Sequence, residues 1–305
     1  MSLRKQISIS PGNAEDIPGI MGLINPRWPP FKPASHYRWL LFDSPASPTI
    51  VCAKHNDAII GLFVIHERQL LSGERCGLVS GLVIEDEYRG LGLFSKLGSA
   101  AVERSPSLDM LCSIANQNGS HALNKNFGYE DWGPIHTYAL HEPQREMQHK
   151  VSVEAISEDT MFPGEIALPP SVTGFSATNS FQSWRYGTGS RYTFYKITAL
   201  DGSYLVIKLF PIHDDEKLVG DVMGIYARHW DASAIVSLVS SGIAAMNAKG
   251  VQDFYGWGGP NDPYIPLLQE AGFETAKPTR RLCVLPLKKN SPASSWHVSM
   301  SDSLR

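Results

Sequence analysis

Hydrophobic residues along this chain alternate with polar residues in some stretches and recur every three or four residues in others. In the first half, alternating or continuous apolar runs predict strands over residues 49–54, 59–66, 77–84, 108–115 and 134–140. A helix is predicted over 93–103, where Phe94, Leu97 and Ala101 share one face, and a second helix over 120–126. This order of elements predicts a mixed sheet flanked by helices, of the α/β (α+β) class.

The same order of elements is found a second time. Three pairs of residues keep nearly the same offset between the halves: Trp39 and Trp184, Gly81 and Gly224, and Gly128 and Gly272. We interpret this repetition as an internal duplication. The polar stretch HEPQREMQHK separates the copies near Glu146, so we expect one domain over residues 1–145 and a second over 146–305, which ends in a polar tail.

Composition and charge narrow the classes of function. At 305 residues with a net charge of −3, the chain has no basic surplus of the kind that nucleic-acid binding requires. No apolar run is long enough to span a membrane, and the N-terminus has no apolar signal-peptide core. The four cysteines lack a CxxC spacing and lie in apolar stretches, which favours buried reduced thiols and a cytoplasmic location. Cysteine and histidine spacing also predicts no metal site.

The stretch EDEYRGLGLFSKL puts two glycines directly before the first predicted helix. A helix start has unpaired N–H groups and a partial positive charge, so it can bind an anion such as a phosphate. Gly90 and Gly92 let the backbone approach that anion closely. The alternative is a strand-to-helix turn that needs glycine for its geometry alone.

Two motifs together resemble the GNAT superfamily of acyl-CoA-dependent N-acyltransferases. The segment LVIEDEYRGLGLFSKL is similar to the family's phosphate-binding signature [Q/R]-x-x-G-x-[G/A], with Glu87 in place of its first residue. The segment NQNGSHALNKNFGYEDWG resembles the family's later helix and follows at the expected distance. The resemblance implies two tandem GNAT-like domains, each a mixed, mostly antiparallel sheet flanked by helices.

The resemblance also implies that acetyl-CoA is the cosubstrate, with no metal. It places the CoA pyrophosphate against the turn and start of the helix, at Arg89, Gly90, Leu91, Gly92, Leu93 and Phe94. It places the pantetheine arm along the backbone of the strand before the turn, at Leu82, Val83 and Ile84. Asn118 and Asn124 of the later helix complete the implied cofactor contacts.

The catalytic positions depart from those of many family members. Asn124 stands where a tyrosine often protonates the leaving thiolate, and an amide is not a general acid at neutral pH. The strand over 77–84 contains no carboxylate or histidine to act as a base. Asn124 can still position a water or donate to the sulfur, and Tyr129 can lend a hydroxyl, although its position usually holds an aromatic residue for packing. The remaining candidates are each more readily explained as solvated or structural residues, namely Glu67, His66, Glu85 and His121.

The second copy differs at the position of the glycine turn. It reads RHWDASAIV there, without glycine and with Asp231 at the mouth of the helix. A carboxylate at that place caps its own helix and repels a pyrophosphate. We therefore expect the second copy to keep the fold without the CoA site. Its segment FYGWGGPNDPY, residues 254–264, is a candidate wall of the acceptor pocket, and the favoured alternative is a loop packed by its own aromatic residues. In the first copy, Trp28, Phe31, His36 and Trp39 can line that pocket or equally belong to a core.

These observations predict an N-acetyltransferase that moves an acetyl group from acetyl-CoA to a primary amine of a small molecule, with an amino sugar as the first candidate. Two alternatives are a CoA-binding sensor or scaffold without turnover, and a tandem synthase similar to mycothiol synthase or the Fem peptidyltransferases. Neither nucleic acid nor membrane is an expected partner. The duplicated chain is expected to be a monomer with an internal pseudo-dimer, or a homodimer.

Overall fold

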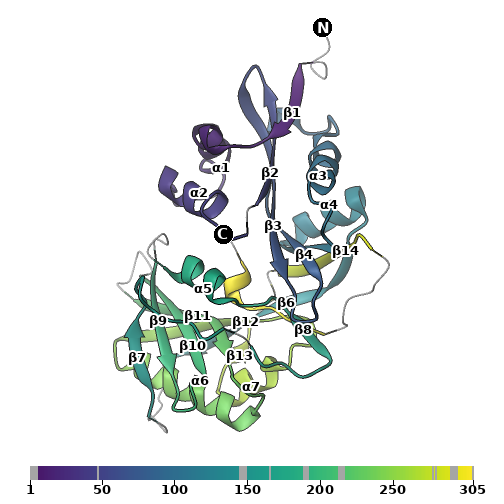
Figure 1. Ribbon diagram of the computed structural model, residues 1–305. Coiled ribbons are helices and arrows are strands. Elements are labelled where there is room, and N and C mark those ends of the chain that lie inside the picture. The colour runs from purple at the N-terminus through teal and green to yellow at the C-terminus, as the bar shows by residue number, and fades with distance from the viewer. Residues whose placement is uncertain are drawn as a thin grey trace.

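The computed structural model describes residues 6–46, 48–143, 150–164, 166–187, 192–211, 217–276, 278, 280–288 and 295–303. The expected boundary near Glu146 lies outside these residues, so the division into 1–145 and 146–305 stays a prediction. The chain forms two lobes that lie one above the other in Figure 1, with the described C-terminal segment between them.

The first half contains the strands and helices that its hydrophobic pattern predicts, with two helices and one strand before them. In chain order they are β1 (Ile7–Pro11), α1 (Ile17–Ile24), α2 (Ala34–Leu41), β2 (Thr49–His55), β3 (Ala58–Gln69), β4 (Arg75–Ile84), α3 (Leu93–Glu103), β5 (Met110–Ala115), α4 (Gln117–Phe127) and β6 (Glu130–His141). Helix α4 ends at Gly128, whose φ of 73° is left-handed, as predicted for a glycine that terminates a helix.

The second half repeats this order. Its elements are β7 (Ser152–Ala155), β8 (Val172–Gly174), α5 (Asn179–Tyr186), β9 (Thr193–Thr198), β10 (Tyr204–Pro211), β11 (Leu218–Tyr226), α6 (Ala232–Asn247), β12 (Val251–Gly258), α7 (Tyr264–Glu270), β13 (Glu274–Thr275), β14 (Arg280–Pro286) and β15 (Ser295–His297). The elements from α2 to α4 in the first half and from α5 to α7 in the second follow the same order: one helix, three strands, a helix, a strand and a helix.

One 13-stranded sheet runs through both lobes in the order β1-β2-β3-β4-β5-β14-β6-β12-β11-β10-β9-β7, with β13 paired to β6. At the centre of this sheet, the two halves of the chain exchange strands. Strand β14, from the second half, lies between β5 and β6 of the first, and β6 in turn pairs with β12 of the second. Each half therefore supplies a strand that the hydrogen bonding of the other half requires.

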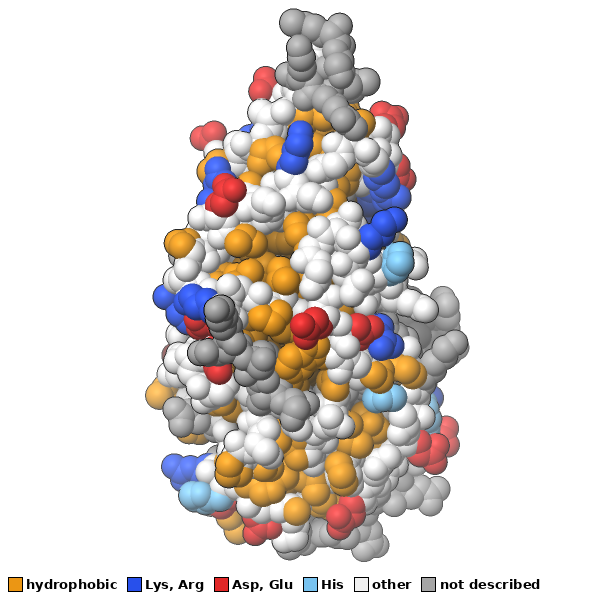
Figure 2. Space-filling model, turned by 90° about the vertical axis from the view of Figure 1, so that its right-hand side faces the viewer, with side chains coloured by type: hydrophobic (Ala, Val, Ile, Leu, Met, Phe, Trp, Pro, Cys, Tyr) orange, Lys and Arg blue, Asp and Glu red, His pale blue; other side chains and the backbone are white. Residues whose placement is uncertain are grey.

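Helices cover both faces of the sheet in the first half. Helices α3 and α4 pack over one face through a cluster that includes Val51, Leu97 and Leu123, and α1 and α2 cover the other through Ile20 and Tyr37. All four cysteines are buried and free, as predicted. Figure 2 shows one face of the molecule, where acidic and basic side chains lie scattered around a hydrophobic band. No described helix is long and apolar enough to cross a membrane.

The two lobes meet at a pair of equivalent tryptophans. The rings of Trp39 and Trp184 stack with centroids 4.9 Å apart and an interplanar angle of 21°. Each indole N–H donates to the backbone carbonyl of the other residue, at 3.0 Å from Trp39 and 3.1 Å from Trp184. Residues that the sequence pairs as equivalents are thus reciprocal partners, which is the contact expected at a local two-fold axis.

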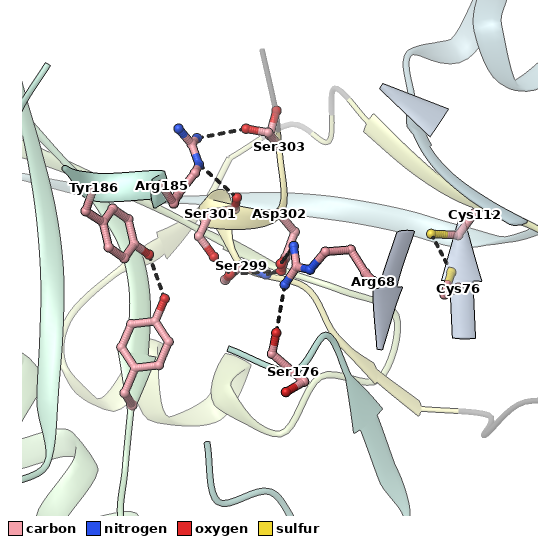
Figure 3. Close-up of polar contacts among 11 residues, drawn as sticks. Arg68, Cys76, Cys112, Ser176, Arg185, Tyr186, Ser299, Ser301, Asp302 and Ser303 are labelled. Atoms are coloured by element: carbon pink, nitrogen blue, oxygen red, sulfur yellow. Dashed lines mark hydrogen bonds and ion pairs between the residues drawn. The ribbon is translucent and has the colours of Figure 1, made fainter. Parts of the chain in front are cut away.

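The last described residues are not a surface tail, contrary to the polar tail expected from the sequence. Trp296 is fully buried, and Asp302 is 4% exposed. The reason is that two buried arginines, one from each half, compensate the segment's polar groups. Arg68 lies 3.5 Å from the Asp302 carboxylate, and Arg185 donates to the carbonyls of Ser301 and Ser303 at 3.1 and 2.9 Å (Figure 3).

Candidate functional site

A gap in the sheet lies between β4 and β5. These two strands are parallel and pair only through Cys76, Gly77 and Leu78. On its other side, β4 stays paired with β3 as far as Ile84, with a shift in register that leaves Ser80 as the extra residue of a β-bulge. The β5-facing edge of β4 beyond Leu78 is therefore open, with backbone groups available to a ligand.

A cavity of about 550 Å³ occupies this region. Its described lining comes from residues 79–83 of β4, the end of β5 and the start of α4, the segment that joins α1 to α2, and parts of α2, β3 and α3. From the described part of the second half, Tyr192 and Arg280 contribute. Most of its wall is apolar, with a few polar groups from Ser80, Ser113 and Asn116. Such a cavity suits a ligand of small-molecule size that is held largely by its shape.

The glycine turn borders this gap at the start of α3. Gly90 and Gly92 have φ values of 77° and 75°, which side chains other than glycine rarely adopt, and no atom lies within 4 Å of a Cβ built on either residue. Helix α3 begins at Leu93 with no side-chain cap. Among the described residues, no acceptor takes a hydrogen bond from the backbone amides of residues 90–95. The turn thus presents an open row of amides at the positive end of a helix dipole.

Ion pairs hold the segment before the turn. Arg89 contacts Asp86 at 2.7 Å, and Arg27 of the α1–α2 segment contacts Glu85 at 3.0 Å. The hydroxyl of Tyr88 is 2.7 Å from Nδ1 of His55 on β2. These contacts fix the 3-10 turn (Asp86–Tyr88) that leads into the glycines. They also direct the Arg89 guanidinium toward Asp86.

The cavity is lined by three of the cofactor contacts predicted from the sequence, namely Leu82, Val83 and Phe94. Ile84 pairs with Gly61 of β3 at the end of the open edge. Asn118 is exposed on the first turn of α4, where its neighbours Asn116 and Gly119 line the cavity instead.

The catalytic candidates are not brought together. Asn124 is exposed, and its side-chain amide donates to the backbone carbonyl of Tyr129 at 2.8 Å. Tyr129 is 1% exposed, burial raises the pKa of its hydroxyl well above the ordinary value, and that hydroxyl has no hydrogen-bond partner among the described residues. Glu67 lies at the opposite end of β3, where Arg75 Nε donates to it at 2.7 Å.

The candidates His66, His121 and Glu85 also lie outside the cavity. His66 is buried on β3, and this burial, reinforced by the charge of Arg68, lowers the pKa of its imidazole to about 3. His121 is exposed on α4. Glu85 forms the ion pair with Arg27 described above. None of these three side chains lines the cavity.

The acceptor side of the cavity is built partly as the sequence indicates. Trp28 and His36 line it, whereas Phe31 is 69% exposed and Trp39 stacks on Trp184. No residue of 254–264 contributes to the cavity. Sequence reasoning missed Lys32, Ser80, Ser113, Asn116, Tyr192 and Arg280. For Asn116 a local signal exists, since it precedes a helix and caps it by accepting from Gly119 N at 2.8 Å.

In the second half, the side chain of Asp231 caps the start of α6, as the sequence predicts for that residue. Asp231 Oδ1 accepts from the backbone amide of Ala234 at 3.1 Å and so caps α6. The pKa of this carboxyl is lowered by the Ala234 amide and by Ser233. Strand β11 also has a shift in register, at Met223, but residues 222–226 are all buried in the core. A backbone amide at the start of α6 therefore has a hydrogen-bond acceptor in its own N-cap side chain, whereas α3 has no such side-chain cap.

Side chains that could hold a metal are not grouped in the described part of the chain, where no cluster of three or more histidine, cysteine, aspartate or glutamate residues is suitably placed. The chemistry that the arrangement offers is instead that of backbone donors at an open strand edge and a helix start. Such donors bind anions and carbonyl oxygens.

Residues 17–129 match the model of the Acetyltransferase (GNAT) family. No curated protein matches the sequence. A GCN5-related N-acetyltransferase from Anabaena variabilis superposes with a TM-score of 0.66 at 12% identity, over 91% of this chain and 72% of the other. One from Kribbella flavida gives 0.62 at 14% identity over 92% and 71%.

A third similar structure is a tandem GNAT protein from the clavulanic acid biosynthesis pathway. It superposes with a TM-score of 0.57 at 12% identity, over 93% of this chain and 100% of its own. At such identities the likeness establishes the fold. The GNAT-type fold class that the two sequence motifs predict is thereby confirmed.

Proposed function

We propose that this chain, whose residues 17–129 match the model of the GNAT acetyltransferase family, transfers an acetyl group from acetyl-CoA to a primary amine of a small molecule. The observation that supports this proposal most directly is the open edge of β4 beside the uncapped start of α3. Acetyl-CoA is a long molecule with a diphosphate in its middle and a thioester at one end. An extended arm can lie along the strand edge while the diphosphate accepts hydrogen bonds from the turn.

The turn suits the diphosphate for two physical reasons. Backbone amides that donate to an ionised oxygen form stronger hydrogen bonds than those that donate to a neutral oxygen. With no Cβ at Gly90 or Gly92 and open space beside both, the phosphate oxygens can approach the main chain. In this proposal residues 90–94 bind the diphosphate, and Arg89 flanks it.

The strand edge suits the pantetheine arm because that arm carries amide groups. Leu82 and Val83 line the cavity, and β4 has no β5 partner at these positions. The arm then adds to the sheet as a short strand would. The β-bulge at Ser80 interrupts the regular ladder next to the cavity, where a backbone donor can face the thioester oxygen.

The amine attacks the thioester directly in this proposal. The nitrogen of the neutral amine bonds to the acetyl carbon and loses one proton to water, the carbon–sulfur bond breaks, and coenzyme A leaves as a thiolate that takes up a proton from water. Neither Asn124, Tyr129 nor Glu67 is assigned the proton transfer, because their side chains are engaged, buried or distant as described above. Catalysis would come mainly from holding the amine and the thioester together.

An amino sugar is the first acceptor to test, since the cavity is partly apolar and carries hydroxyl and amide groups for orientation. Two other functions have a specific observation in their favour. The lack of an evident acid and base at the cavity favours a sensor that binds CoA compounds without turnover. The presence of two GNAT-like halves favours a tandem synthase, similar to mycothiol synthase or the Fem enzymes.

Calorimetric titration with acetyl-CoA tests the proposal. We expect one site per chain, and we expect Gly90→Glu to abolish binding because the new carboxylate occupies the anion's place. Gly250→Glu is the matched control, since Gly250 also has a left-handed φ of 92° with no atom within 4 Å of its Cβ position, and it lies in the second half. That variant should bind acetyl-CoA as the parent does.

Two other results would contradict the proposal in different ways. Two sites per chain would mean that the second half also binds CoA despite its capped helix. A binding-competent protein that consumes no thioester in the presence of any amine would leave the sensor in place of the transferase. Thioester loss, followed by absorbance with a library of primary amines, separates these two functions.

A further inference from the structure

The described side chains that line the cavity carry positive charge only. Among the described residues, Lys32 and Arg280 are the charged ones that contribute to its wall, and no described aspartate or glutamate does so. The other titratable groups of the wall are His36, Tyr37 and Tyr192. A primary amine in water at neutral pH is an ammonium ion. The described part of the wall offers this ion no opposite charge, and its two cations repel the ion.

Arg280 is partly buried at the start of β14 and has no carboxylate within ion-pair distance among the described residues. Its neighbour Arg281 differs, because alternation along the strand turns it to the other face, where it pairs with Asp131. A guanidinium in a largely apolar wall is costly to desolvate unless it meets an anion. Its planar set of N–H donors matches the two oxygens of a carboxylate or phosphate.

Lys32 reaches the same cavity from the segment between α1 and α2, and side-chain contacts fix the backbone of that segment. The Asn25 amide group donates to the Lys32 carbonyl at 3.0 Å, and the Lys32 amide donates back to Asn25 at 3.1 Å. The Tyr37 hydroxyl holds the same Asn25 oxygen at 2.9 Å. Two cations from opposite ends of the sequence are thus placed on one cavity before any ligand binds.

We infer that the acceptor is a primary amine that also bears an anionic group, a carboxylate or a phosphate, which Arg280 and Lys32 bind. This inference rests on the proposed function, because it names the acceptor class of the same site. It also accounts for the missing base. Nearby cations disfavour the ammonium form, so the anionic group holds the acceptor in place while the positive wall helps its amine to lose a proton to water.

A second source of the anion is acetyl-CoA itself, whose phosphates could meet the same cations. The two sources differ in what a neutral residue at position 280 would change. If the anion belongs to the acceptor, Arg280→Gln impairs acceptor use and leaves acetyl-CoA affinity unchanged. If it belongs to the cofactor, acetyl-CoA affinity falls instead.

The test compares each anionic amine with its neutral counterpart under saturating acetyl-CoA. The pairs are β-alanine with β-alaninamide, and glucosamine 6-phosphate with glucosamine. For at least one pair we expect kcat/KM to favour the anionic member by about tenfold or more, the usual size of a charged hydrogen bond. Arg280→Gln should remove this preference, Arg280→Lys should keep part of it, and Arg281→Gln, the matched control, should keep all of it.

The pH dependence of kcat is a second measurement. With Arg280 neutralised, the bound amine should deprotonate at higher pH, so the rise of kcat should move to a more alkaline range in Arg280→Gln but not in Arg281→Gln. A purely structural role for Arg280 would lower kcat at every pH without this movement.

The remaining outcomes separate the inference from the proposed function. If neutral amines are acetylated as well as anionic ones, or if Arg280→Gln keeps the preference, the inference is wrong and the acetyltransferase stands. The inference is equally wrong if acetyl-CoA binds but neither anionic amine is acetylated, or if Arg280→Gln weakens acetyl-CoA binding instead. Failure of the parent protein to bind acetyl-CoA would overturn the proposed function itself.

Discussion

Burial decides the behaviour of single residues in this protein more than chemical type does. His66 on β3 and His297 on β15 are both buried histidines, yet their pKa values move in opposite directions. Burial lowers the pKa of His66 to about 3, with Arg68 acting in the same sense. For His297, burial also disfavours the charged form, but the charge and hydrogen bond of Asp262 outweigh it and raise the pKa above its ordinary value.

His66 should therefore make the protein sensitive to acid. Its folded pKa lies below the ordinary value of 6.5, so between those values the unfolded chain binds the extra proton. The free energy of unfolding should fall with decreasing pH below 6.5, by up to about 1.4 kcal/mol per pH unit from this residue. Chemical denaturation of His66→Gln across this range should show a shallower decline than the parent protein.

His121→Gln provides the control for that experiment, because His121 is exposed on α4. The free energy of unfolding of His121→Gln should depend on pH as that of the parent protein does. A decline that is unchanged in His66→Gln would mean that other groups dominate. His297 acts in the other direction, since the stability it contributes is present below 6.5 and is lost as the pH rises through its folded value.

The sequence predicts the side chains near the glycine turn better than those of the opposite wall. Gly90, Gly92 and Leu82 are found together because strand, turn and helix follow one another directly along the chain, where local patterns are informative. Arg280 reaches the cavity from the second half because β14 inserts between β5 and β6, and Tyr192 reaches it from the position directly before β9. No local pattern predicts which distant strand pairs with β5, so these residues could not be identified from the sequence.

At the scale of elements, α3 and α6 are equivalent helices whose N-termini differ in capping. Helix α6 is capped by the side chain of its own Asp231, and α3 begins at Gly92 without such a cap. In the proposed function the ligand's phosphate supplies to α3 what the carboxylate supplies to α6. In this proposal, the sequence at the helix start separates a binding element from a structural one.

Asp231→Ala should lower the thermal midpoint of unfolding by a few degrees, because the first turn of α6 loses its hydrogen-bond acceptor. Acetyl-CoA affinity should not change, since α6 has no part in the proposed site. The two readouts are differential scanning calorimetry and calorimetric titration of the same sample. Loss of acetyl-CoA binding with a folded Asp231→Ala protein would contradict the assignment of the site to the first half.

Acetyl-CoA itself should stabilise the parent by occupying the open N-terminus of α3. A ligand present at one hundred times its Kd adds roughly 2.7 kcal/mol to the free energy of unfolding. The thermal midpoint should therefore rise with acetyl-CoA concentration, and Gly90→Glu should not show this rise. A rise that persists in Gly90→Glu would place the ligand elsewhere.

At the scale of the whole molecule, the two halves behave as one structural unit because they share strands, a stacked tryptophan pair and the C-terminal segment. The sequence repeat predicts the equivalence of Trp39 and Trp184. It does not predict that they touch, since periodicity describes each half separately. Their contact depends on how the two halves of the sheet join, and that junction is set by the pairing of β6 and β14 with strands of the other half.

A double-mutant cycle on the tryptophans tests this coupling. Trp39→Phe and Trp184→Phe each keep an aromatic ring but leave one carbonyl without its indole donor, at a cost of about 1 kcal/mol each in the free energy of unfolding. Because the rings stack on each other, the double variant should depart from the sum of the single ones by roughly 0.5 kcal/mol or more. Strict additivity would show that the two halves are not coupled through this pair.

The placement of β14 also has a consequence for biosynthesis. The first half leaves the ribosome before residues 280–286 exist, so β5 and β6 emerge without the strand that joins them. The usual order, in which an N-terminal domain folds while the remainder is translated, then gives an incomplete sheet with exposed strand edges that can aggregate. We expect ribosome-bound chains stopped before residue 280 to stay protease-sensitive in both halves, and released full-length chains to become resistant. Completion of this sheet therefore requires that β14 has been translated and has inserted between β5 and β6.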